Sequence, residues 1–256
     1  MIQKPQTIAA DVSEMIRHLA RTAGTHAMAK AMAVSILDEC TKLQKVDVVL
    51  ASLFKANIYA LTGELEEVER WFKNAEQNRA PPDKVDRARE IVYFLTGQIS
   101  KAYPYFDGLE RSDPAALFNK AMSCGWFDRA VSLANETANL AVPAAIVALA
   151  RQAQSVAKEL DLTELLASQI MDQVHGTMVG RGLIWLDVCP SFTVLDLQHG
   201  GPAIHITFRI ADTPGSAAEL SWDLASKLAA KRLDDKGLLV SYQGTVLQKA
   251  QESALV

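Results

Sequence analysis

Residues 59–81 read YALTGELEEVERWFKNAEQNRAP, and residues 93–114 read YFLTGQISKAYPYFDGLERSDP. Each stretch holds a tyrosine, a glycine four residues later, a small or branched apolar residue, a second aromatic residue and a turn proline. The matching positions are Tyr59, Gly63, Val68, Phe72 and Pro81, then Tyr93, Gly97, Ala102, Phe106 and Pro114. Self-similarity at this period, about 34 residues, is typical of a stacked array of two-helix units.

The local chemistry agrees with the spacing. Apolar residues recur at helical offsets on both sides of Gly63, which ends the first helix where a left-handed cap needs no Cβ. Pro81 and Pro82 prevent the second helix from continuing. A looser third copy has Gly125, and its first helix begins at Asp113-Pro114, a capping residue before a first-turn proline.

On these residues, the stretch from 49 to 143 resembles tetratricopeptide repeats. Ser52 departs from the tryptophan of the family pattern, and Val68 stands where the family usually has alanine. The resemblance implies a right-handed superhelix whose concave groove holds a peptide or another protein domain. A generic helical bundle with coincidental spacing is the alternative.

Two helices are expected before the repeats, over residues 7–22 and 25–43. They form either a diverged first repeat or a capping hairpin, because terminal repeats are often atypical. The second is rich in methionine, which suits either an adaptable binding surface or core filling. His18 and His26 lie on either side of the expected break and have no third ligand nearby, so no metal site is expected there.

Two further helices are expected over residues 144–160 and 164–175, the second capped by Thr163. Gly176, Gly180 and Gly182 then mark a shift in composition. We therefore expect a helical repeat domain over residues 1–176 and a small α+β domain over residues 182–256.

The hydrophobic period changes from 3.6 to 2 after Gly182. Strands are expected over residues 183–188, 192–197 and 204–210, then a helix over 216–233 and a last strand over 238–242. A crossover helix favours a parallel arrangement of the last two strands. The order β-β-β-α-β is similar to half of a ferredoxin-like sandwich, and the predicted class is α+β, mostly α.

Composition narrows the classes of function. The chain has 256 residues, is 49% hydrophobic and 22% charged, and carries a net charge of −4. It can bury a core, and without a basic patch nucleic acid is not the expected partner. Three widely spaced cysteines indicate reduced thiols in a cytoplasmic protein, and neither a signal peptide nor a membrane span is expected.

No catalytic, cofactor-binding or metal-binding motif is present, so an enzyme is the least supported class. Residues 198–201, QHGG, are similar to the oxyanion loop of some hydrolases, but no Gly-x-Ser-x-Gly nucleophile motif accompanies them. The helix start at residues 213–216 offers free backbone N–H groups to an anion, as every helix start does. His205, Thr207 and Arg209 share the polar face of one strand and are either a ligand face or solvated.

The leading hypothesis is a non-catalytic adaptor, scaffold or chaperone-like protein that captures a protein partner on the repeat groove, near Asn57 and Arg89. One alternative is a sensor that binds a small ligand through His205 and Arg209. Another is a structural subunit that self-assembles into a homo-oligomer.

Overall fold

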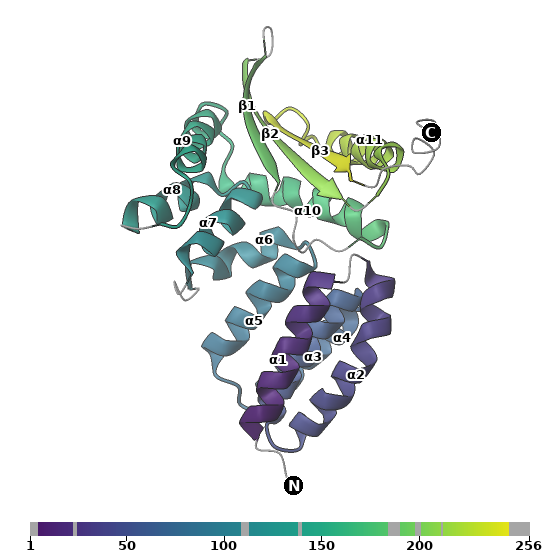
Figure 1. Cartoon of the computed structure of the whole chain (residues 1–256). Helices are drawn as coiled ribbons and strands as arrows, with labels where there is room; N and C mark the ends of the chain where they lie inside the picture. Colours follow the sequence, from purple (N-terminus) through teal and green to yellow (C-terminus); the bar gives the residue numbers. More distant parts are fainter. Residues whose placement is uncertain are drawn as a thin grey trace, which may run out of the picture. The chain divides into compact units, whose positions relative to one another are not determined.

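The computed structural model describes residues 5–22, 25–108, 113–137, 140–183, 190–197, 201–210 and 212–245. These residues form eleven α-helices, one 3-10 helix and a three-stranded sheet near the C-terminus (Figure 1), so the fold is α+β and mostly α, as predicted. Contacts divide the chain into two compact units, Met1–Leu109 with Met178–Asp187, and Glu110–Thr177 with Val188–Val256. The predicted domain division at residues 176–182 stays a prediction.

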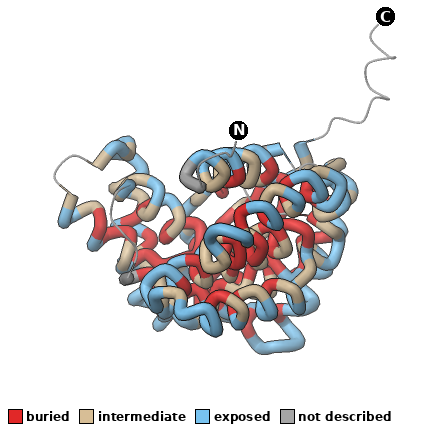
Figure 2. Tube along the Cα trace, turned by 90° about the horizontal axis from the view of Figure 1, so that it is seen from below, coloured by how far each residue is buried: buried red, intermediate tan, exposed pale blue. Residues whose placement is uncertain are grey.

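The first unit is helical. Its elements are α1 (Pro5–Thr22), α2 (His26–Gln44), α3 (Val48–Thr62), α4 (Leu65–Gln77), α5 (Pro82–Leu95), α6 (Ile99–Ala102) and the 3-10 helix η1 (Tyr103–Gly108). Helix α3 is central, because Ile58 and Leu61 pack with α1 and α2 while Leu53 and Ala56 pack with α4 and α5. Figure 2 shows buried positions on the inward sides of the helices and exposed positions on their outer sides.

The glycine turns of the three predicted repeats share one hydrogen-bond pattern. Gly63, Gly97 and Gly125 have φ of 77°, 68° and 73°, a left-handed conformation that favours glycine. In each turn the amide after the glycine donates to the carbonyl five residues earlier: Glu64 to Tyr59 at 2.9 Å, Gln98 to Tyr93 at 2.8 Å and Trp126 to Ala121 at 2.9 Å. This 6→1 bond is the signature of the Schellman motif. The first helix of each predicted repeat therefore ends in the same way.

The second hairpin differs from the first after its turn. A full second helix was expected from the repeat spacing, yet α6 ends at Ala102 and continues as η1. Pro104 explains the difference, because proline has no N–H to donate and its ring clashes with the carbonyl of the preceding turn.

The second unit begins with two helical hairpins. Its helices are α7 (Pro114–Ser123), α8 (Phe127–Glu136), α9 (Ala144–Glu159) and α10 (Glu164–Gly180), the last of which ends in the first unit. The side chains of Asp113 and Thr163 cap α7 and α10, as predicted. Helix α10 was expected to end at His175 but continues through Gly176. Its flanking residues explain this, because Val174 and His175 before the glycine, and Thr177 and Met178 after it, are buried.

The sheet has the order β1-β2-β3, with β1 (Ser191–Leu197) antiparallel to β2 (Gly201–Ile210) and β2 parallel to β3 (Leu238–Gly244). The predicted parallel pair is therefore confirmed, with α11 (Pro214–Ala230) as the crossover. The strand expected over residues 183–188 lies almost entirely outside the described residues. The end of that range that is described, Leu183, forms an isolated bridge with Thr25.

Helices α10 and α11 contact β3. The Tyr242 hydroxyl donates to the Val174 carbonyl of α10 at 2.6 Å. The Tyr242 amide donates to the Ser221 hydroxyl of α11 at 3.0 Å, so a side chain rather than a neighbouring strand satisfies this amide. Among the residues described, none of the helices combines the length and the apolar run needed to cross a bilayer.

Helix ends that lack glycine lead to a stability prediction. Arg232 follows α11 with φ of 56°, where a Cβ atom crowds the next carbonyl. We expect Arg232→Gly to raise the free energy of unfolding by about 0.5–1 kcal/mol, measured by urea denaturation. Gly125→Ala is the matched opposite change, because its φ is positive and a Cβ there would lie 3.1 Å from the Ala167 Cβ. A loss of stability in Arg232→Gly would contradict the prediction.

Candidate functional site

The polar face of β2 carries a small hydrogen-bonded cluster. His205 Nε2 lies 2.9 Å from Ser241 Oγ on the neighbouring strand β3, and 3.4 Å from Thr207 Oγ1. The two hydroxyl groups are 3.3 Å apart. These three partly exposed side chains form the histidine–hydroxyl cluster.

The register of the sheet explains this grouping. Thr207 and Ser241 are paired positions in the parallel β2–β3 ladder, so their side chains point to the same face. The opposite face is apolar, since Ile204, Ile206 and Phe208 are fully buried. The structure thus brings the predicted His205 and Thr207 together and adds Ser241, which the sequence analysis missed. Arg209 is exposed further along β2, paired with Gln243.

A serine beside a histidine is the first element of a nucleophile and its base. A third group that orients the imidazole is the next element of such a site. Among the described residues, the hydrogen-bond partners of the His205 ring are hydroxyl groups and not a carboxylate. The cluster therefore offers hydrogen-bond donors and acceptors to a bound polar group.

Asn57 and Arg89, the predicted partner-binding residues, have different surroundings. Asn57 on α3 is half-buried, and its buried Oδ1 accepts no hydrogen bond from the described residues. Arg89 on α5 donates to Glu76 Oε1 of α4 at 2.6 Å, and its guanidinium lies 5.5 Å from the centre of the Phe72 ring. The Arg89 side chain thus joins α4 to α5 and stays 23% exposed.

A buried lysine lies elsewhere in the first unit, and the sequence analysis did not single it out. Lys55 Nζ donates to Gln44 Oε1 at 2.7 Å and lies 4.2 Å from the centre of the Trp71 ring. Burial lowers the pKa of this ammonium group. A lysine within the apolar run of α3 was the sequence signal that could have identified it. The Trp71 side chain also lines a hollow of about 410 Å³ along α4, together with Glu66, Glu69, Arg70, Lys73, Asn74 and Gln77.

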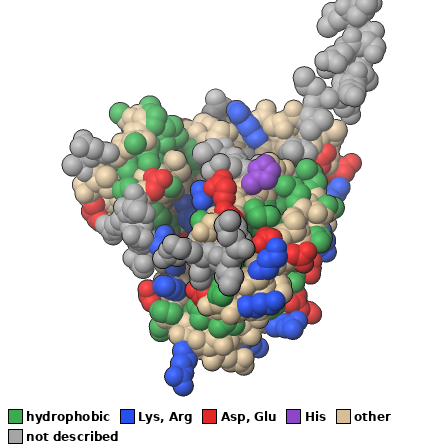
Figure 3. Space-filling model, turned by 60° about the horizontal axis from the view of Figure 1, so that its bottom comes forward, with side chains coloured by type: hydrophobic (Ala, Val, Ile, Leu, Met, Phe, Trp, Pro, Cys, Tyr) green, Lys and Arg blue, Asp and Glu red, His purple; other side chains and the backbone are tan. Residues whose placement is uncertain are grey.

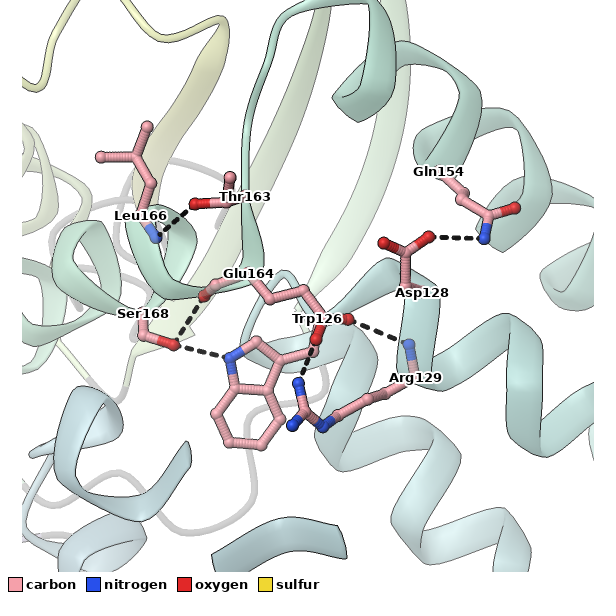
Figure 4. Close-up of polar contacts among 8 residues, drawn as sticks. All are labelled: Trp126, Asp128, Arg129, Gln154, Thr163, Glu164, Leu166 and Ser168. Atoms are coloured by element: carbon pink, nitrogen blue, oxygen red, sulfur yellow. Dashed lines mark hydrogen bonds and ion pairs between the residues drawn. The ribbon is translucent and has the colours of Figure 1, made fainter. Parts of the chain in front are cut away.

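A polar network in the second unit joins α8 to α10 (Figure 4). Glu164 accepts the Arg129 backbone N–H at 2.9 Å and forms an ion pair with the Arg129 guanidinium. Ser168 accepts the Trp126 indole N–H at 2.7 Å and donates to the Glu164 carbonyl at 2.7 Å. The side chains of Arg129 and Glu164 are largely buried, with 17% and 12% of their surface exposed.

This network supplies a helix cap that α8 lacks locally. Trp126 precedes α8 and makes no side-chain cap. Arg129 is the third residue of α8, and its amide is one of those that a helix start leaves without an intrahelical acceptor. The carboxylate of Glu164, from the first turn of α10, provides the acceptor. The network is therefore a structural joint between two hairpins.

The helix start at Thr213 is occupied by its own side chains. Thr213 Oγ1 accepts the Ser216 amide at 3.2 Å. Asp212 accepts the Thr213 amide at 2.7 Å and the Ser216 hydroxyl at 2.5 Å. A carboxylate already lies beside these donors, so an external anion would meet like charge. The loop at residues 198–200 lies outside the described residues.

The described residues hold no group of three or more His, Cys, Asp or Glu side chains able to bind a metal ion. Basic and acidic side chains lie next to one another on the face drawn in Figure 3.

No protein-family model matches the chain, and the comparisons with curated proteins and with solved structures found no similar protein.

Proposed function

We propose that this chain is a non-catalytic adaptor of the tetratricopeptide-repeat type, which binds a protein partner through its helical hairpins. The supporting observation is that the first helix of each predicted repeat ends at a glycine, Gly63, Gly97 or Gly125, with one backbone conformation and one hydrogen-bond pattern, which also closes α10 at Gly182. Repeats of this kind build extended surfaces from a unit that cannot bury its apolar face alone.

Burial of the repeat positions adds support. Val68, Phe72 and Ala75 of the first repeat are at most 2% exposed, and Ala102 and Phe106 of the second are also buried. The side chains that define the repeat pattern thus pack in the core, as expected if the pattern serves to pack the helices of each repeat together. The short α6 is a departure from the regular two-helix unit.

Asn57 and Arg89 are the proposed contact residues. The Asn57 Oδ1 atom is buried, so a partner would contact the remaining accessible part of this half-buried side chain. Arg89 presents a planar set of donors, of which Glu76 takes one. Reduced cysteines favour a cytoplasmic location for this interaction.

The test separates contact from stability. The full chain is used as bait in a quantitative affinity purification, and Arg89→Ala and Asn57→Ala are each expected to weaken capture of the same partner by roughly tenfold. Glu76→Ala is the matched control, because it breaks the same ion pair and leaves the guanidinium in place. Equal loss in Arg89→Ala and Glu76→Ala would assign Arg89 a structural role and contradict the proposed contact.

A second candidate function rests on the histidine–hydroxyl cluster. We infer that a small polar ligand binds this face in a regulatory role, contacting His205 and Arg209. A metabolite panel is expected to yield a thermal shift that His205→Ala abolishes and Asn57→Ala leaves intact. Light scattering on the same samples tests self-assembly into a homo-oligomer, which would replace both functions if the chain is stably oligomeric and binds neither partner nor ligand.

A further inference from the structure

An open hollow of about 390 Å³ lies between α1 and α2 in the first unit. Met15 and His18 of α1 and Met32 and Ile36 of α2 line it, with Glu14 and Ser35. Met15 and His18 are three residues apart, so they project from one face of α1. Met32 faces them from the other helix, and both methionines are partly buried against the same core.

The Met32 sulfur contacts α1 next to the His18 backbone. The Met32 Sδ atom is 3.7 Å from Thr22 Oγ1, and Thr22 Oγ1 donates to the His18 carbonyl at 2.8 Å. The sulfur therefore lies beside the turn of α1 that links His18 to Thr22, and the flexible Met32 side chain can rotate from there toward the imidazole. The Met15 side chain borders the same hollow, one turn earlier on α1.

This donor set has a defined chemical preference. Thioether sulfur is a soft, polarisable and neutral ligand, and imidazole accompanies it in sites for soft metal ions. Hard dications favour oxygen ligands. The carboxylate that lines this hollow belongs to Glu14, and it already forms an ion pair with Arg17 at 2.9 Å. We propose that Met15, His18 and Met32 form a binding site for a soft monovalent metal ion, Cu(I) in the cell, which Ag(I) can probe.

Cysteine thiols are the main competitors for such an ion, and two of the three are disfavoured. Cys40 and Cys124 are fully buried. Burial raises the pKa of the Cys40 thiol to about 12, and the thiolate is the form that binds metals. Cys189 lies outside the described residues, so the experiment uses the full chain with Cys189→Ser.

The first measurement follows the methionine methyl groups by NMR during titration with Ag(I). The expected result is saturation at one ion per chain, with the ε-methyl signals of Met15 and Met32 shifted together. Met122, which is buried in α7 of the second unit, provides the internal reference and is expected to stay unchanged. Equal shifts at all methionines, or no shift at Met15 and Met32, would overturn the proposal.

Variants then separate ligation from packing. Met15→Leu and Met32→Leu keep the side-chain volume and remove the sulfur, and each is expected to weaken Ag(I) binding by roughly tenfold or more. His18→Gln is expected to do the same, while Met122→Leu has no effect on affinity. Unchanged affinity in all three site variants would overturn the proposal, as would binding that disappears with Cys189→Ser alone. The partner-capture test remains independent of this result.

Discussion

Replacing Glu164 with alanine is expected to lower the free energy of unfolding by about 3–5 kcal/mol. The change removes the acceptor of the Arg129 amide and leaves the Arg129 guanidinium, 17% exposed, without its carboxylate. Breaking a buried ion pair on one side costs more than the pair contributes, because the remaining charge stays desolvated and loses its opposite charge. Denaturant unfolding monitored by circular dichroism measures the loss.

Two controls test this explanation. Asp128→Ala removes a neighbouring carboxylate of α8 whose ion pair with Lys158 is exposed, at 60% and 65%, and we expect a loss below about 1 kcal/mol. In a double-mutant cycle, Arg129→Ala with Glu164→Ala is expected to lose less than the two single losses added together. Additive losses would show that the two side chains act independently and would contradict the joint between α8 and α10.

As the pH is lowered, the free energy of unfolding is expected to fall already at pH values well above the range in which carboxylates titrate. His175 of α10 is 1% exposed, its ring lies edge-on to Phe208, and burial lowers its pKa well below the usual 6.5. The folded state keeps the ring neutral, whereas the unfolded chain takes up a proton below about pH 6.5. The contribution of the neutral His175 ring to stability is therefore fully present above pH 6.5. Below pH 6.5 the free energy of unfolding falls by up to about 1.4 kcal/mol per pH unit.

The slope, rather than the absolute stability, identifies His175 as the source. His175→Leu changes packing and so shifts stability at every pH, but it removes the titrating group. Between pH 6.5 and about pH 5, where Asp and Glu are still ionised, this variant is expected to keep only the smaller slope that His26 contributes, because burial also lowers the pKa of that half-buried ring. His205→Ala is the control and is expected to keep the slope. The same slope in His175→Leu would show that another group binds the proton.

Much of the helical part was predictable because its signals are local. Glycine in a left-handed turn and proline at a helix start act within a few residues, so the sequence around Gly63, Gly97 and Asp113 indicates where helices end and begin. The alternation from Ile204 to Ile210 likewise predicts a strand with one buried face, which β2 confirms.

The errors arose where tertiary packing outweighs a local signal. Gly176 suggested a boundary, but the helix continues because buried neighbours offset a glycine cost of about 1 kcal/mol. Helix α10 ends at Gly180, before a turn in which Gly182 has φ of 70° and the Leu183 amide donates to the Met178 carbonyl.

The site was predictable in part for a related reason. Alternation along one strand placed His205 and Thr207 on a polar face, while Ser241 joins them through the register of two strands separated by α11. The joint between Arg129 and Glu164 spans 35 residues and leaves no periodic trace in the sequence. Contacts of this kind depend on how hairpins pack.

The Ser221–Tyr242 hydrogen bond has a consequence for protein handling at high concentration. An edge strand with open amides is a template on which another chain adds a strand, and this is a common route to fibrils. In β3 the Tyr242 amide is already taken by the Ser221 hydroxyl, so an incoming strand meets an interrupted ladder at that point. The Ser221 hydroxyl group thus disfavours the addition of another strand at this edge.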